Sequence, residues 1–167
     1  GPAAGVTVNA VKSGVGSIIG GTCTTTVTDG NGECTVTVNS NTPGQIQVDV
    51  DANVTVNGIV GSATVHVSST GYGAYITQNQ KLWADARISI VESGTNQVGN
   101  AHTFTVTVEK DTGSGFGPAA GVAVTPSITG TGGITGGTCG NVNTDAAGQC
   151  TIIVNSATTG TATVNAS

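Results

Sequence analysis

Apolar and polar residues alternate with a period of two along much of the chain. Phe104, Val106 and Val108, for example, share one parity and are separated by threonines. Because successive side chains of a strand point to opposite faces, this pattern predicts strands with one dry and one wet face. The predicted strands are residues 6–8, 24–28, 34–38, 46–50, 54–56, 63–67, 86–91, 103–108, 122–124, 150–154 and 161–164.

The composition also predicts an all-β chain. Its 167 residues include 29 Thr, 23 Val and 11 Ile but a single Leu and no Met. β-branched side chains are stiff at χ1 and suit a pleated sheet, whereas helices favour unbranched side chains such as Leu, Met and Lys. The net charge is only −5, and a low net charge argues against disorder.

An internal repeat organises the chain. The sequence GPAAGV begins at Gly1 and again at Gly117, and an ungapped offset of 116 residues makes 25 of 51 aligned positions identical, both cysteines included. Each repeat holds about seven short strands separated by glycine-rich turns, which is typical of an immunoglobulin-like β-sandwich. The chain is therefore predicted to cover about one and a half such domains in tandem.

The repeat also predicts domain limits. Residues 1–67 are expected to form a first domain that lacks its opening strands, and residues 82–167 a second domain that lacks its closing strands. Residues 68–81 break the alternation and are rich in Gly, Ser and Gln, which indicates a linker. No signal peptide opens the chain and no apolar run has the length of a membrane span. We expect a mature product or an internal piece of a longer array that does not insert into a membrane.

The four cysteines form two pairs with the same spacing. Cys23 and Cys34 flank a predicted turn at residues 28–32, and Cys139 and Cys150 flank its counterpart. A zinc site would need closely spaced Cys or His partners, and a catalytic thiol would not recur as a matched pair. We therefore predict a disulfide within each pair, which indicates an extracellular or cell-surface location.

The other reactive side chains form no known catalytic motif, so no enzyme activity is expected. Four Lys and Arg residues are too few to neutralise a nucleic-acid backbone, so no nucleic-acid partner is expected. Asp49 and Asp51 share one strand face and are either solvated or ligands for calcium, the one metal considered as a cofactor. Tyr72, Tyr75 and Trp83 surround the linker, where they either pack between domains or form a platform for a glycan.

Four segments carry a family resemblance. They are residues 83–90 (WADARISI), 99–108 (GNAHTFTVTV), 137–139 (GTC) and 144–150 (TDAAGQC). They resemble the tandem Ig-like repeats of large bacterial surface and secreted proteins, including the bacterial Ig-like domains of invasin-type and intimin-type adhesins. The resemblance implies repeats that act as spacers, stalks or fibre-forming units, and it supplies no catalytic residues.

Three functions remain open at this point. The first is a non-enzymatic structural repeat of an extracellular stalk or end-to-end filament, whose partners are copies of itself or adjacent repeats, head to tail. The second is an adhesin module that binds a glycan or a host protein. The third is an accessory domain of a secreted enzyme. A structural repeat predicts matched surfaces, whereas an adhesin predicts an exposed patch that differs between repeats.

Overall fold

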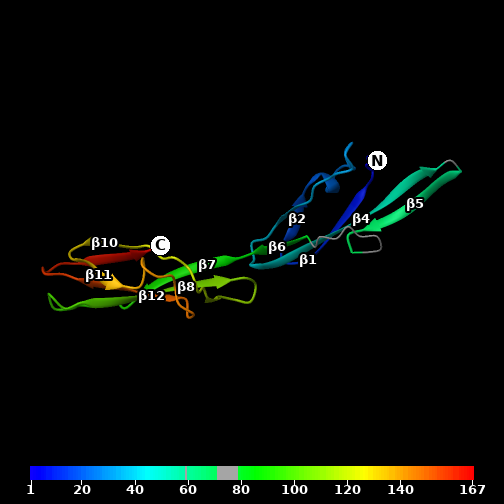
Figure 1. Ribbon diagram of the computed structural model, residues 1–167. Coiled ribbons are helices and arrows are strands. Elements are labelled where there is room, and N and C mark those ends of the chain that lie inside the picture. The colour runs from blue at the N-terminus through cyan, green and yellow to red at the C-terminus, as the bar shows by residue number, and fades with distance from the viewer. Residues whose placement is uncertain (59, 71–78) are drawn as a thin grey trace. The chain divides into compact units, whose positions relative to one another are not determined.

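The computed structural model describes residues 1–58, 60–70 and 79–167 and confirms the predicted all-β class (Figure 1). The chain divides into two compact units, Gly1–Trp83 and Ala84–Ser167. Within the described residues the sole helical element is one turn of 3-10 helix, η1, at Thr22–Thr24. No helix in this part of the chain has the length and apolar character needed to cross a membrane.

Unit 1 is built around one long strand. Its strands are β1 (Val8–Gly14), β2 (Ser17–Gly20), β3 (Thr37–Asn39), β4 (Gly44–Gly58), β5 (Gly61–Ser68) and β6 (Gln80–Trp83). β1 pairs with residues 46–52 of β4, β5 pairs with residues 51–58 and β6 with residues 44–47, all antiparallel. β2 and β3 form a separate two-stranded sheet.

Unit 2 contains a larger sheet and a two-stranded one. Its strands are β7 (Asp85–Val91), β8 (His102–Asp111), β9 (Gly117–Pro118), β10 (Pro126–Gly130), β11 (Gly133–Gly137), β12 (Gln149–Asn155) and β13 (Ala162–Ala166). The larger sheet has the order β11-β12-β8-β7, with β9 added to β8, and β10 pairs with β13.

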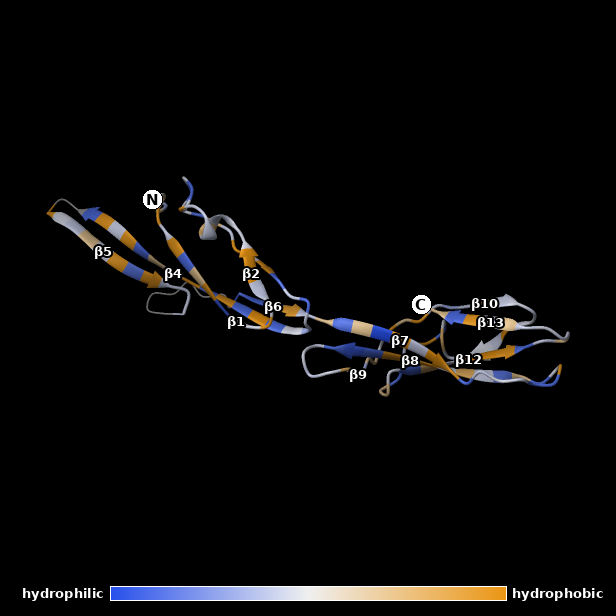
Figure 2. Ribbon diagram, turned by 180° about the vertical axis from the view of Figure 1, so that it is seen from behind, coloured by the Kyte–Doolittle hydropathy of each residue, from blue (hydrophilic) through white to orange (hydrophobic). Residues whose placement is uncertain are grey.

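The core of unit 2 joins side chains from both sheets. Val106 on β8 and Ile152 on β12 are 0% and 1% exposed. Ile128 on β10 and Val164 on β13 pack against the same cluster. Val106, Ile152 and Val164 lie on apolar faces that the alternation predicts, whereas Ile128 lies in β10, which the sequence analysis does not predict. Figure 2 shows comparable bands of apolar and polar residues along β4 and β5 of unit 1.

One predicted strand, residues 24–28, is wrong. The segment begins in the 3-10 turn, where Thr24 Oγ1 donates to Gly21 O at 2.8 Å and Thr26 Oγ1 donates to Thr22 O at 3.0 Å. Threonine hydroxyls can satisfy nearby carbonyl groups in this way and so compete with a sheet ladder. A run of threonines that suits a strand by propensity therefore folds locally.

The strands at 6–8 and 122–124 are also predicted in the wrong place, because the sheet strands β1 and β10 start later. Val6 shows the reason in unit 1. Its N–H donates to Thr28 Oγ1 and its carbonyl accepts from the Thr28 N–H, both at 2.9 Å. The backbone at Val6 is thus bonded to a single distant threonine, and pairing with β4 begins only at Val8. The predicted strands 46–50 and 54–56 merge into β4, since β1 and β5 pair with it on both sides of Asp51.

The division between the units differs from the predicted boundary at residue 82. Leu82 pairs with Gln45 and Trp83 with Gly44, so the backbone of β6 belongs to the sheet of unit 1. Residues 71–78 of the predicted linker lie outside the described residues. Unit 1 therefore ends at Trp83, after the strand that follows this segment.

Candidate interaction site in the first unit

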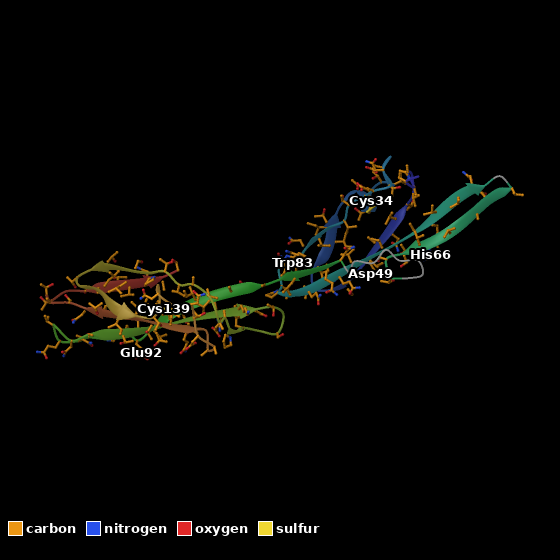
Figure 3. All side chains as sticks on the ribbon, in the orientation of Figure 1. Cys34, Asp49, His66, Trp83, Glu92 and Cys139 are labelled. Carbon is orange, nitrogen blue, oxygen red and sulfur yellow. A yellow bond between two sulfur atoms is a disulfide. The ribbon has the colours of Figure 1, made fainter. Side chains whose placement is uncertain are left out.

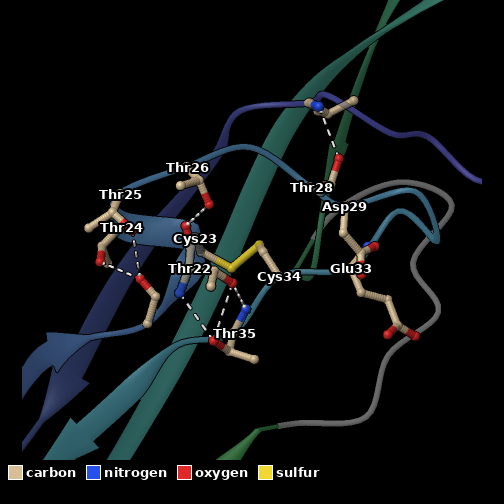
Figure 4. The surroundings of a disulfide bond; sticks show 12 residues. Thr22, Cys23, Thr24, Thr25, Thr26, Thr28, Asp29, Glu33, Cys34 and Thr35 are labelled. Atoms are coloured by element: carbon tan, nitrogen blue, oxygen red, sulfur yellow. Dashed lines mark hydrogen bonds between the residues drawn. A yellow bond between two sulfur atoms is a disulfide. The ribbon is translucent and has the colours of Figure 1, made fainter.

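Both predicted disulfides are present. Cys23 and Cys34 are joined with a Cα–Cα distance of 5.0 Å, and Cys139 and Cys150 with 5.1 Å. In unit 1 the bridge ties η1 to the segment that leads into β3 (Figure 4). Each bridge closes a loop whose ends lie 11 residues apart. In the chain-entropy description it lowers the conformational entropy of the unfolded chain and so stabilises the fold by about 3 kcal/mol.

An aspartate organises the turn inside each disulfide loop. Asp29 Oδ1 accepts hydrogen bonds from the N–H groups of Asn31 at 2.8 Å and Glu33 at 3.0 Å. In unit 2, Asp145 Oδ1 accepts from the N–H groups two and four residues later, both at 2.9 Å. Both turns lie where the sequence predicts them, and aspartate side chains commonly bond the backbone of their own turn in this way.

A buried threonine beside each turn holds the GPAAGV segment. Thr28 Oγ1 donates to Ala3 O at 2.6 Å while it accepts from the Val6 N–H at 2.9 Å. Thr144 makes the same two bonds at the same distances to the residues 116 positions further on. This role of the threonine is not among the sequence predictions, although the identity of Thr, Asp and GPAAGV in both repeats is a signal for it.

Beside the disulfide of unit 1 lies an open groove of about 1030 Å³. Its lining is largely apolar and comes mainly from β3, β4 and the disulfide loop, with further residues from β1 and from the start of β6. The apolar lining includes Cys34, Val36, Val38, Ile46, Val48 and Val50. Among these, Ile46 is fully buried, whereas Cys34, Val36 and Val38 remain half-buried.

In unit 2, strand β8 covers the region that corresponds to this groove. Its β12, which matches residues 33–39 of unit 1 at the repeat offset, pairs with β8 along one edge and with β11 along the other. Val106 on β8 lies opposite Cys150, and Phe104 lies opposite Ile152. The two units thus present the same half of a core, which β8 covers in unit 2 and which the described residues of unit 1 leave open.

The predicted calcium candidates lie on β4 of unit 1 (Figure 3). Asp51 Oδ1 accepts from Asn9 Nδ2 and Asp49 Oδ1 accepts from Gln47 Nε2, both at 3.0 Å. Each carboxylate is therefore bonded to a side-chain amide. In the ranges that the structure describes, no three His, Cys, Asp or Glu side chains gather as metal ligands.

Of the aromatic candidates, Trp83 lies at the end of β6, where it is half-buried (Figure 3). The ammonium of Lys81 lies 5.9 Å from the centre of its ring. Tyr72 and Tyr75 lie outside the described residues, so the proposed aromatic platform is represented by Trp83 alone.

A smaller polar hollow of about 470 Å³ lies at one end of unit 2. Asn96 Nδ2 donates to Ala101 O at 2.9 Å and Asn155 Nδ2 donates to Gly99 O at 3.1 Å, which ties the loops around it together. The ring of His102 meets Phe104 edge-on with 4.7 Å between the ring centres. The hollow offers amides and hydroxyls to a polar ligand.

One ion pair joins β7 to β8. Arg87 Nε lies 2.7 Å from Glu109 Oε2. The hydrogen bond from Arg87 lowers the pKa of the Glu109 carboxyl, and the same bond raises the pKa of Arg87. The guanidinium also lies 4.2 Å from the ring centre of Phe116.

Comparison of the chain with protein-family models, with curated proteins and with solved structures finds no match.

Proposed function

We propose that the chain is a structural part of an extracellular array of Ig-like domains that forms a stalk or an end-to-end filament. The observation that carries this proposal is the recurrence of one scaffold in both units. The disulfide, the turn capped by an aspartate and the threonine that holds the GPAAGV segment all recur 116 residues later with matching distances. Repetition of a whole supersecondary unit is typical of proteins that gain length by stacking similar domains.

The strand orders support an Ig-like sandwich. In unit 2 the sheet β11-β12-β8-β7 is combined with the pair β10-β13. In unit 1 the order β1-β4-β5 is combined with the pair β2-β3. With β1 matched to β10, β2 to β11 and β4 to β13 by the repeat, and with the short strands β6 and β9 set aside, the strands of the two units combine to a four-stranded and a three-stranded sheet. An Ig constant-type sandwich has these numbers of strands in its two sheets, which supports the proposal.

Two disulfides in a chain with few large side chains favour an oxidising location outside the cytosol. A stalk needs this kind of covalent reinforcement, since small sandwiches bury little apolar surface.

Electron microscopy of the purified, unreduced chain tests the proposal. We expect thin beaded fibres whose length grows with protein concentration, and reduction of the disulfides should shorten or dissolve them. A particle that stays a compact monomer by light scattering at every concentration contradicts the filament.

The polar hollow in unit 2 favours a second candidate function, an adhesin module that binds a glycan. A glycan array incubated with the labelled chain tests it. Binding that is lost when the hollow is filled by Thr159→Trp and kept with Asn41→Trp, on the exposed surface of unit 1, supports this function. An array without bound glycans removes it.

A further inference from the structure

We propose that the groove of unit 1 is an acceptor site for a β-strand of the β8 type, supplied by another repeat of the same class. This inference rests on the proposed function, because it names the partner through which one repeat would join the next. The incoming strand lies antiparallel to residues 34–39, with alternating Phe and Val directed into the groove.

The free edge of β3 supports the acceptor role. In unit 2, β12 has a partner on each edge, β11 on one side and β8 on the other. In unit 1, β3 pairs only with β2 among the described residues. An edge with unpaired backbone groups is a template for a further strand, which is the basis of β-augmentation.

A pair of backbone groups next to the groove is positioned for this strand. In unit 2, Val108 of β8 donates its N–H to Gly148 O at 2.8 Å and accepts from the Ala119 N–H at 2.9 Å. In unit 1 the matching groups are Gly32 O and the Ala3 N–H. Neither forms a backbone hydrogen bond within the described ranges.

The spacing of this pair is the same in the two units. A Cβ placed on Gly148 would lie 2.9 Å from Ala119 N, and one placed on Gly32 would lie 3.0 Å from Ala3 N. Both glycines have a left-handed backbone, with φ of 74° and 77°, which favours glycine. Gly32 O and the Ala3 N–H thus already have the spacing that their counterparts in unit 2 have when they bind Val108.

Differences in burial between the two units show which positions the strand would cover. Ala119 is 3% exposed, whereas Ala3 is exposed. Ile152 is 1% exposed, whereas its counterpart Val36 is only half-buried. In unit 2, β8 lies directly against both positions, because the Ala119 N–H donates to Val108 O and Ile152 lies opposite Phe104. Covering the same apolar positions in unit 1 supplies the driving force for binding.

The register of β8 in unit 2 defines the chemistry of the partner. Val106 lies opposite Cys150 and Phe104 opposite Ile152, so the partner places Val at Cys34 and Phe at Val36. Threonines alternate with them and face outward. The β8 of this chain already pairs with β7 and β12, so the donor strand comes from another repeat.

A synthetic peptide with the sequence of β8, HTFTVTVEKD, labelled at its N-terminus, tests the site on the full chain by fluorescence anisotropy. We expect saturable binding to the oxidised chain with one peptide per chain. The same peptide with V106D should bind at least about tenfold more weakly, because it buries an unpaired carboxylate opposite Cys34. The peptide with T105D, changed on the outward face, should bind within about twofold of the original.

Variants of the chain locate the binding to unit 1. Val36→Lys places an ammonium in the groove and should abolish binding, whereas Thr37→Lys, on the exposed side of the same strand, should retain it. Intact mass and circular dichroism verify that both variants keep their disulfides and strands. Binding that survives Val36→Lys, or that is equal for the two altered peptides, overturns the acceptor site.

The outcomes separate this inference from the proposed function. Fibres in the microscope without any binding of the peptide support the filament and overturn the groove as its joint. Saturable binding without fibres supports the acceptor groove and contradicts self-assembly into filaments. Capture of peptides of unrelated sequence with the same affinity overturns a partner of the β8 type.

Discussion

Removing the hydroxyl of Thr144 should destabilise unit 2 far more than an exposed substitution. The side chain is 5% exposed and its Oγ1 donates to Ala119 O at 2.6 Å and accepts from the Val122 N–H at 2.9 Å. Thr144→Val keeps the shape and removes both bonds. The carbonyl and the N–H are then left without these partners beside the core.

The size of the effect follows from those two groups. A buried polar group that loses its partner costs about 1–3 kcal/mol. Two such groups give about 2–6 kcal/mol, and the added methyl group recovers up to about 1 kcal/mol of this, which leaves a net loss of about 1–5 kcal/mol. Unit 2 comprises residues 84–167, and for a domain of that size each kcal/mol shifts the melting temperature by roughly 4–8 °C. The transition of unit 2 should therefore fall by about 4–40 °C.

Differential scanning calorimetry measures the shift. Thr144→Ser is the matched control, because it keeps the hydroxyl and loses only one methyl group, so its transition should fall by about 5 °C or less. Thr28→Val removes the corresponding bonds in unit 1 and should leave the transition of unit 2 in place. The reasoning is refuted if Thr144→Val lowers the transition by less than about 3 °C, or if Thr144→Ser lowers it as much.

Three further predictions concern other parts of the scaffold. The unreduced protein should show no alkylatable thiol by intact mass, and replacing Cys139 and Cys150 by alanine should lower the stability to urea by about 3 kcal/mol; four reactive thiols would contradict the disulfides. Gly137→Ala should cost about 1–3 kcal/mol by urea unfolding because φ is 112° and a Cβ would meet backbone there, whereas Gly133→Ala, with open space around it, should be nearly neutral. Because the pKa of Glu109 is lowered, its ion pair with Arg87 stabilises the fold fully above the ordinary pKa of a glutamate, and this stabilisation is lost as the pH falls through the lowered value. The free energy of unfolding of Glu109→Gln, measured with urea, should therefore change less between neutral and acidic pH than that of the unaltered chain. An identical pH dependence would contradict the pair.

Local patterns in the sequence account for much of this structure. The alternation at residues 103–108 places Val106 and Val108 on one face, and both are buried in β8. The spacing of the cysteines around an aspartate turn predicts both disulfides. These features depend on residues close in sequence, so periodicity, turn chemistry and spacing are sufficient to find them.

Features that depend on distant partners are not visible in the sequence. Val6 has the same β propensity as the valines of the sheet, yet its backbone bonds to Thr28 instead of a sheet strand. Leu82 follows a stretch without alternation and still pairs with Gln45. In each case a group some 20 to 40 positions away decides the outcome, and propensity carries no information about it.

The sequence by itself determined the β class, the two disulfides, the turns and the repeat, because each of these follows from the types of residues and their spacing along the chain. Only the tertiary structure decided that two nearly identical segments differ in exposure. Ala3 and Ala119 occupy the same place in the GPAAGV repeat, yet Ala3 is exposed to solvent and Ala119 is buried. The physical reason is that burial depends on which strand lies alongside, and β8 lies beside only the second of them.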